Sequence, residues 1–224
     1  MKTTNLASYN IYEFECDDEL TNKILADIQQ QQIIWLPSAI KDSNLLGYLG
    51  SKESPVPYYH VELFNWFDDC LNIVSNDQFN NIKLTICDSW LTKSKLGQQA
   101  DWHIHTKSIY SGLFYLTTHN TADTLFEYNK TPIKNILGNA GDDLITLKTF
   151  VSNPKKNKLI FFPSDLKHSV RINKDIRQTR HTLSFNTYYD GVISNTNTSF
   201  LDIKVNSVQD RYKSYINKKN NETM

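Results

Sequence analysis

The stretch KLIFFPSDLKHSVRI, residues 158–172, decides the fold class, because it holds two short strand-like segments separated by a polar turn. Its first five residues form a largely apolar run of the kind found in buried strands. Pro163 ends that run, since proline has no N–H to donate to a strand ladder. The second segment opens near His168. Short strands at this spacing are typical of a β-sandwich or a β-barrel.

Further segments extend this pattern toward both ends of the chain. Strand-like composition recurs at residues 82–92, 109–116, 143–151 and 180–189. Helical spacing of apolar residues occurs earlier, at residues 18–31 and 58–74. We therefore expect one mainly β domain over residues 1–224, with helical N-terminal support (1–80), a β core (81–206) and a polar tail (207–224). The loop from Tyr128 to Gly141 is expected to form a lid.

Composition narrows the class of protein. The 224 residues suffice for one large domain, and 24 basic side chains balance 24 acidic ones. Zero net charge gives no long-range attraction to nucleic acid or an anionic membrane, so neither is the expected partner. Three cysteines without a CxxC pair predict reduced thiols. No secretory signal or membrane span is apparent, so we expect a cytoplasmic location. A homodimer is compatible with the sequence, which does not fix the oligomeric state.

Two histidines stand two residues apart in WHIH, residues 102–105. On a strand, His103 and His105 would project from the same face and could bind one metal ion together. His168, which opens another strand, is the candidate for a third ligand. Three such ligands with open positions suit a catalytic first-row metal. The pair alone also fits two hydrogen-bonded or surface imidazoles.

A second polar face is expected on RHTLSFN, residues 180–186. Strand alternation places Arg180, Thr182, Ser184 and Asn186 on one side. The guanidinium group of arginine can donate two parallel hydrogen bonds to a carboxylate, and a hydroxyl two residues further along can complete the site. The same pattern also fits a strand whose polar side meets solvent.

Three segments together resemble a known family. HIHTKSIYSGLFYL (residues 103–116) is similar to the signature HxHxxSxxSGxxYL of a family of 2-oxoglutarate/iron(II) oxygenases found in marine bacteria and phages. FFPSDLKHSV (161–170) resembles the family's second signature, FPSxLxHxV, and RHTLSFN resembles the third, RxSxSFN. The three ordered motifs spread over roughly half of the chain.

The resemblance implies a double-stranded β-helix, or jelly roll, that binds Fe(II) and uses 2-oxoglutarate as cosubstrate. His103 and His168 would be iron ligands, Arg180 would pair with the far carboxylate of 2-oxoglutarate, and Thr182 would lie beside that carboxylate. In the wider superfamily a carboxylate stands where this chain has His105. We favour His105 as the third ligand, while an outer role for His105, or ligation by Asp101, stays open.

The implied activity is that of a dioxygenase that hydroxylates a substrate and releases succinate and CO2. The substrate is unidentified and could be a small molecule or a protein side chain. Two alternatives remain: a three-histidine iron dioxygenase of cupin type without 2-oxoglutarate, and a non-catalytic jelly-roll protein that binds ligands or belongs to a virion. Trp90 and Trp102 are interpreted as packing residues. Tyr110 and Tyr115 lie on opposite strand faces, so only one should point inward.

Overall fold

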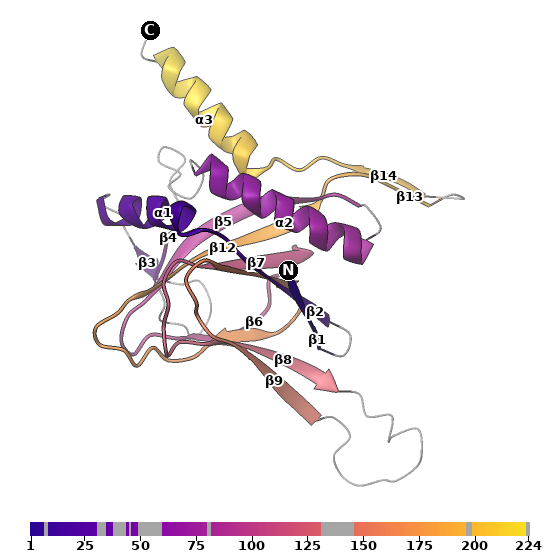
Figure 1. Cartoon of the computed structure of the whole chain (residues 1–224). Coiled ribbons are helices and arrows are strands. Elements are labelled where there is room, and N and C mark those ends of the chain that lie inside the picture. The colour runs from indigo at the N-terminus through magenta and orange to yellow at the C-terminus, as the bar shows by residue number, and fades with distance from the viewer. Residues whose placement is uncertain are drawn as a thin grey trace, which may run out of the picture.

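The computed structural model describes residues 1–6, 9–30, 35–37, 44, 46–48, 60–79, 82–130, 146–195 and 199–222. Two antiparallel sheets face each other, as Figure 1 shows. The larger has the strand order β1-β2-β10-β7-β12-β5-β4-β3, and the smaller has the order β6-β11-β8-β9. This architecture is the double-stranded β-helix that the family resemblance implies.

The strands of the larger sheet are, in spatial order, β1 (Lys2–Leu6), β2 (Tyr9–Glu15), β10 (Lys158–Pro163), β7 (Tyr110–Tyr115), β12 (Arg180–Tyr189), β5 (Leu84–Ser94), β4 (Leu46–Tyr48) and β3 (Leu36–Pro37). Those of the smaller sheet are β6 (Ala100–His103), β11 (His168–Val170), β8 (Thr124–Lys130) and β9 (Thr146–Ser152). A separate hairpin joins β13 (Gly191–Asn195) to β14 (Ser199–Ile203). The helices are α1 (Asp18–Gln30), α2 (Val61–Phe79) and α3 (Val208–Glu222).

The larger sheet separates two apolar clusters. Its outer face packs against α2, where Phe67 contacts Phe114 of β7 and Phe185 of β12. Figure 1 shows α2 lying along that face. The inner cluster, which includes Tyr115 and Phe126, fills the space between the sheets. Strand alternation on β12 thus sends its apolar side chains to the helices and leaves its polar side chains for the interior.

A β-bulge interrupts the pairing of β6 with β11. His103 lies opposite His168, but Ala100 lies opposite Val170, so β6 spans one residue more than its partner. Ala100 and His103 both face the space between the sheets, since both line the same internal cavity. The bulge therefore changes which side chains of β6 point inward.

Several elements differ from the sequence expectation. The strand expected at residues 180–189 has those bounds, and β5, β7, β9, β10 and β11 fall close to theirs. The segment 1–80, expected to be helical, also gives β1 and β2 to the larger sheet, and the expected polar tail contains α3. β8 and the β13–β14 hairpin were not expected. Most of the expected lid (128–141), namely residues 131–141, lies outside the described residues. None of the described helices is long and apolar enough to cross a membrane.

Candidate metal centre

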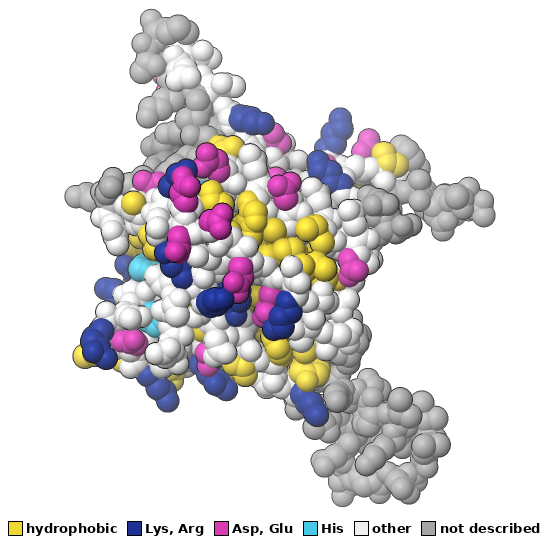
Figure 2. All heavy atoms as spheres, viewed as in Figure 1, with side chains coloured by type: hydrophobic (Ala, Val, Ile, Leu, Met, Phe, Trp, Pro, Cys, Tyr) yellow, Lys and Arg dark blue, Asp and Glu magenta, His cyan; other side chains and the backbone are white. Residues whose placement is uncertain are grey.

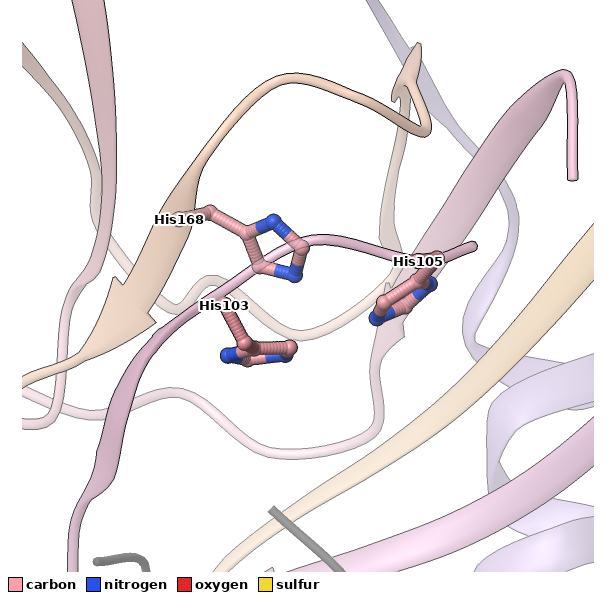
Figure 3. A group of neighbouring side chains, drawn as sticks. All are labelled: His103, His105 and His168. Atoms are coloured by element: carbon pink, nitrogen blue, oxygen red, sulfur yellow. The ribbon is translucent and has the colours of Figure 1, made fainter. Parts of the chain in front are cut away.

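Three imidazoles converge between the two sheets (Figure 3). His103 ends β6, His105 follows two residues later, and His168 begins β11. One potential ligand atom from each lies within 4.8 Å of the others. The ring centroid of His168 is 4.2 Å from that of His103 and 4.9 Å from that of His105. Because His103 and His168 are direct partners in the β6–β11 ladder, the sheet itself brings them together.

Main-chain carbonyls orient two of these rings. Nδ1 of His103 lies 2.7 Å from the carbonyl oxygen of Asp101, and Nδ1 of His168 lies 2.9 Å from that of Leu166. A carbonyl oxygen only accepts, so Nδ1 is the protonated nitrogen that donates in both rings. Nε2 then keeps its lone pair, as a metal-binding imidazole requires.

Side chains from three distant segments hold His105. Its Nδ1 lies 2.8 Å from Asn186 Oδ1 and 2.8 Å from Ser111 Oγ. Ser111 Oγ donates to Asn186 Oδ1 at 3.0 Å and lies 2.8 Å from Ser164 Oγ. Ser164 Oγ in turn donates to Ser108 Oγ at 2.8 Å. The amide oxygen of Asn186 makes Nδ1 the donor in this ring too, which leaves Nε2 for a metal.

Burial keeps the three imidazoles neutral at neutral pH. Desolvation lowers the pKa of His103, and it lowers the pKa of His105 to about 4 with a further contribution from neighbouring His103. The pKa of His168 falls well below its ordinary value for the same reasons. Neutral imidazole is the form that binds a metal ion, so the site is ready for one without losing a proton.

Asp101 lies elsewhere than the sequence suggested. Simple alternation predicts that it shares a face with His103, but the bulge in β6 breaks that alternation. The side chain of Asp101 is exposed and is not part of the three-histidine group. Its contribution to the site is its carbonyl oxygen, which accepts from His103.

The histidines line one part of an internal cavity of about 70 Å³ that extends to Arg180. Thr182 and Ser184 line it from β12, so the polar face expected for that strand does point inward. Trp90, interpreted from the sequence as a packing residue, also lines the cavity, with its ring centroid 5.5 Å from that of His105. The cavity therefore joins candidate metal ligands to a candidate anion-binding residue.

Arg180 is a buried cation, with 1% of its surface exposed. Its Nη2 donates to Thr124 Oγ1 at 3.2 Å, and its guanidinium carbon lies 5.3 Å from the centre of the Tyr115 ring. Its Nε is buried and has no hydrogen-bond partner among the described residues. Within that part of the chain, no carboxylate lies within 4.0 Å of the guanidinium. Burial lowers the pKa of Arg180, but arginine stays charged in proteins.

An acidic ligand would be a suitable partner for Arg180. A buried charge without a counter-ion is costly, and an anion in the cavity would relieve that cost. Thr182, fully buried, hydrogen-bonds Thr92 through its hydroxyl on the same side of the cavity. The residue types at the two parts of the cavity thus suit a metal ion and a carboxylate.

Sequence reasoning missed the residues that support these groups. It did not assign Ser108, Ser111 and Ser164 a role, and it placed Asn186 only on a polar face. All four residues occupy fixed positions of the three motifs, so the motifs already marked them as candidate site residues. Their shared role depends on contacts between strands far apart in the chain.

Comparison with known proteins supports the fold. Residues 88–186 match the model of a family described as "Putative 2OG-Fe(II) oxygenase". Those residues include all three histidines, Arg180 and Asn186. The cofactors of that family, iron(II) and 2-oxoglutarate, are the two predicted from the sequence. No curated protein matches the chain.

Solved structures share the fold at low identity. A prolyl-4-hydroxylase from Pseudomonas putida is 12% identical, with a TM-score of 0.55 over 83% of this chain and 96% of that one. The epimerase SnoN from nogalamycin biosynthesis, described as α-ketoglutarate dependent, is 8% identical, with a TM-score of 0.59 over 88% and 87%. HygX from Streptomyces hygroscopicus, solved with nickel, 2-oxoglutarate and hygromycin B, is 9% identical, with a TM-score of 0.55 over 81% and 83%.

Proposed function

We propose that the chain is a 2-oxoglutarate- and Fe(II)-dependent dioxygenase that hydroxylates a substrate. His103, His105 and His168 hold the iron, and Arg180 with Thr182 binds the far carboxylate of 2-oxoglutarate. The observation that carries this proposal is one cavity lined by three neutral imidazoles and by a buried arginine that lacks a carboxylate partner in the described structure. Either feature alone would fit several classes of protein.

Each part of the cavity has a distinct task in this proposal. Bound iron(II) would supply the redox centre at which dioxygen converts 2-oxoglutarate to succinate and CO2 and hydroxylates a C–H bond of the substrate. Arg180 orients the cosubstrate by a charge-assisted hydrogen bond from Nε, the atom without a partner. The hydrogen bonds at Nδ1 keep the imidazoles from rotating. Trp90 covers His105 and limits the entry of water.

The substrate is proposed to be a small molecule or a protein side chain. Both classes occur among proteins of this fold: one is named a prolyl-4-hydroxylase, and another was solved with hygromycin B. Neither name decides the substrate here, because a shared fold does not determine the substrate. The charge balance of the chain keeps nucleic acid as the less favoured class.

Anaerobic titration with iron(II) and 2-oxoglutarate tests the proposal. We expect the weak visible charge-transfer band of the iron–2-oxoglutarate chelate in the wild type. His168→Ala should lose the band through loss of iron. Arg180→Met should bind iron normally but require roughly 100-fold more 2-oxoglutarate, since it removes a charge-assisted interaction. Arg177→Met, at an exposed arginine nearby, is the matched control and should behave as the wild type.

The outcome also separates the alternatives. Bound iron without the band, together with oxygen uptake that yields no succinate, would favour the three-histidine dioxygenase that needs no 2-oxoglutarate. Absence of iron binding in the wild type would favour the non-catalytic jelly-roll protein.

A second pair of variants tests the third ligand. We expect His105→Ala to weaken metal binding by 100-fold or more, since it removes one of three ligands. Asp101→Ala should change it by less than threefold, because the side chain of Asp101 is exposed and the contact of this residue with His103 is made by its main-chain carbonyl. The reverse order of effects would make Asp101 the ligand.

A further inference from the structure

A second buried cation lies behind the anion site. Lys158, the first residue of β10, is 9% exposed, and its Nζ donates to Ser152 Oγ at 2.9 Å. Among the described residues, no carboxylate comes within 4.0 Å of this amine. The nearest acidic groups on β2 have other partners, since Glu13 pairs with Lys2 at 3.0 Å and Glu15 pairs with Lys155 at 2.7 Å.

Tyr115 connects Lys158 to Arg180. The amine of Lys158 lies 5.2 Å from the centre of the Tyr115 ring, and the guanidinium carbon of Arg180 lies 5.3 Å from it. The hydroxyl of Tyr115 donates to Thr124 Oγ1 at 2.8 Å, and that oxygen also accepts from Arg180. On the other side, the same hydroxyl lies 3.5 Å from Ser152 Oγ, the acceptor of Lys158.

A purely structural role explains this lysine poorly. The next inward-facing residues of the same strand, Ile160 and Phe162, belong to the inner apolar cluster. An apolar side chain at position 158 would continue that cluster without the desolvation cost that lowers the pKa of Lys158. The buried amine costs stability, since its hydrogen bond to Ser152, its contact with the Tyr115 ring and the more distant charges of Glu13 and Glu15 leave its pKa lowered by desolvation.

We propose that Lys158 is a positioning residue for the anion site, one that raises its affinity for the distal carboxylate of 2-oxoglutarate through Tyr115. This inference rests on the proposed function, in which that carboxylate binds Arg180. The amine does not touch the ligand. It adds positive potential across the Tyr115 ring and fixes the hydrogen bonds that orient Thr124. For any two charges about 10 Å apart in a medium with an effective dielectric constant of about 20, the Coulomb energy corresponds to a change in affinity of roughly tenfold.

Ligand binding to the nickel-loaded protein, measured by calorimetry, tests this role without turnover. Two ligands are compared: 2-oxoglutarate, and 2-oxopentanoate, which keeps the metal-binding end but lacks the distal carboxylate. We expect Lys158→Met to weaken 2-oxoglutarate binding roughly tenfold and to leave 2-oxopentanoate binding unchanged. Lys158→Gln, which keeps a donor for Ser152, should show the same selective loss. Lys158→Arg should retain most of the affinity.

Lys156→Met is the matched control, because that lysine lies two residues away and pairs with Asp18. It should bind both ligands as the wild type does. Equal weakening of both ligands by Lys158→Met and Lys158→Gln would show general damage and overturn the proposal, as would no change for either. If the wild type binds 2-oxopentanoate but gains nothing from the distal carboxylate, the assignment of Arg180 fails first, and the role of Lys158 fails with it.

Discussion

At the scale of single residues, the charge of the proposed ligand set distinguishes this site. Three imidazoles bring no negative charge, whereas the usual set of two histidines and a carboxylate brings one. Iron(II) held by His103, His105 and His168 would therefore keep its full positive charge. With Arg180 in the same cavity, the site would attract a dianionic cosubstrate more strongly than a carboxylate-containing site does.

Asn186 offers a direct test of how His105 is held. We expect Asn186→Ala to weaken metal binding 10- to 100-fold, because the ring loses its amide acceptor and can rotate. Competition with a chromophoric chelator measures this affinity with zinc or cobalt. Asn120→Ala, at an exposed asparagine, is the control and should not change it. An unchanged affinity in Asn186→Ala would mean that Ser111 alone orients His105.

The sequence predicts some residues of this site and not others, for physical reasons. His103, His168 and Arg180 stand out in the sequence because the side chain of a candidate metal ligand or of a candidate anion-binding residue is distinctive by type. Asn186 supports His105 through a contact between residues 81 positions apart, which local spacing does not reveal. The orientation of Asp101 was predicted wrongly, because one extra residue in β6 reverses the alternation on which that prediction rested.

At the scale of elements, β7 and β12 can pack under α2 only because position 112 has no side chain. Gly112 lies opposite Phe185 in the β7–β12 ladder, and a Cβ atom there would overlap the Phe185 ring. That ring cannot move easily, since it packs against Phe67 and Phe161. Close packing of the Phe185 ring therefore requires glycine at position 112.

We expect Gly112→Ala to lower the free energy of unfolding by roughly 2 kcal/mol, the usual scale of overpacking in a core. Urea denaturation measures the loss. Phe185→Leu in the same chain should recover part of it, because the smaller side chain leaves room for the new methyl group. Equal losses in the single Gly112→Ala variant and the double variant would show that the clash lies elsewhere.

One of the contacts of α3 with the rest of the molecule involves a carboxyl group with a raised pKa. Gln209 of α3 donates to Asp68 of α2 at 2.9 Å, and burial raises the pKa of Asp68 from 3.8 to about 6. The folded state therefore binds this proton more tightly than the unfolded state. The stabilising contribution of that proton is complete below pH 3.8 and is lost as the pH rises through 6.

Asp68→Asn mimics the protonated carboxyl group and keeps an acceptor for Gln209. At pH 7.5 we expect it to stabilise the protein by roughly 1 kcal/mol, a value reduced for the partial exposure of this group. The gain should shrink as the pH falls from 7.5 to 5. Thermal unfolding across that range measures it, with Asp69→Asn at an exposed neighbour as control. A gain that does not vary with pH would contradict the assignment.

The elements themselves were predictable where apolar patterning is strong. β10 and β12 carry buried residues along most of their length, and both were expected close to their observed bounds. β1 and β2 were missed because they complete the sheet by pairing with β10, which is remote in sequence. α3 has few apolar residues and resembles a frayed tail, yet Ser207 caps its start by accepting from the N–H of Asp210 at 3.0 Å. This capping serine is the feature of the sequence that indicates the start of the helix.

At the scale of the whole molecule, the space between the two sheets contains buried polar groups that lower the stability of the fold. Facing sheets of this size would ordinarily fill the space between them with apolar side chains, as the inner cluster does in part. Instead, one cavity there holds three histidines and Arg180, and Lys158 lies behind it. The fold thus carries buried polar and charged groups whose cost its ligands would offset, so stability and ligand binding should oppose each other here.

The variant Arg180→Met tests whether stability and ligand binding oppose each other. Without 2-oxoglutarate, we expect the variant to be more stable than the wild type by roughly 1–2 kcal/mol, a rise of a few degrees in Tm, because methionine removes an unpaired buried charge and keeps much of the volume. With metal and 2-oxoglutarate added, the order should reverse, since only the wild type gains stability from the ligand. Arg177→Met should follow the wild type in both conditions. A variant that melts lower than the wild type without ligand would show that the guanidinium holds the fold together through Thr124 and Tyr115, and Arg180 would then be a structural residue first.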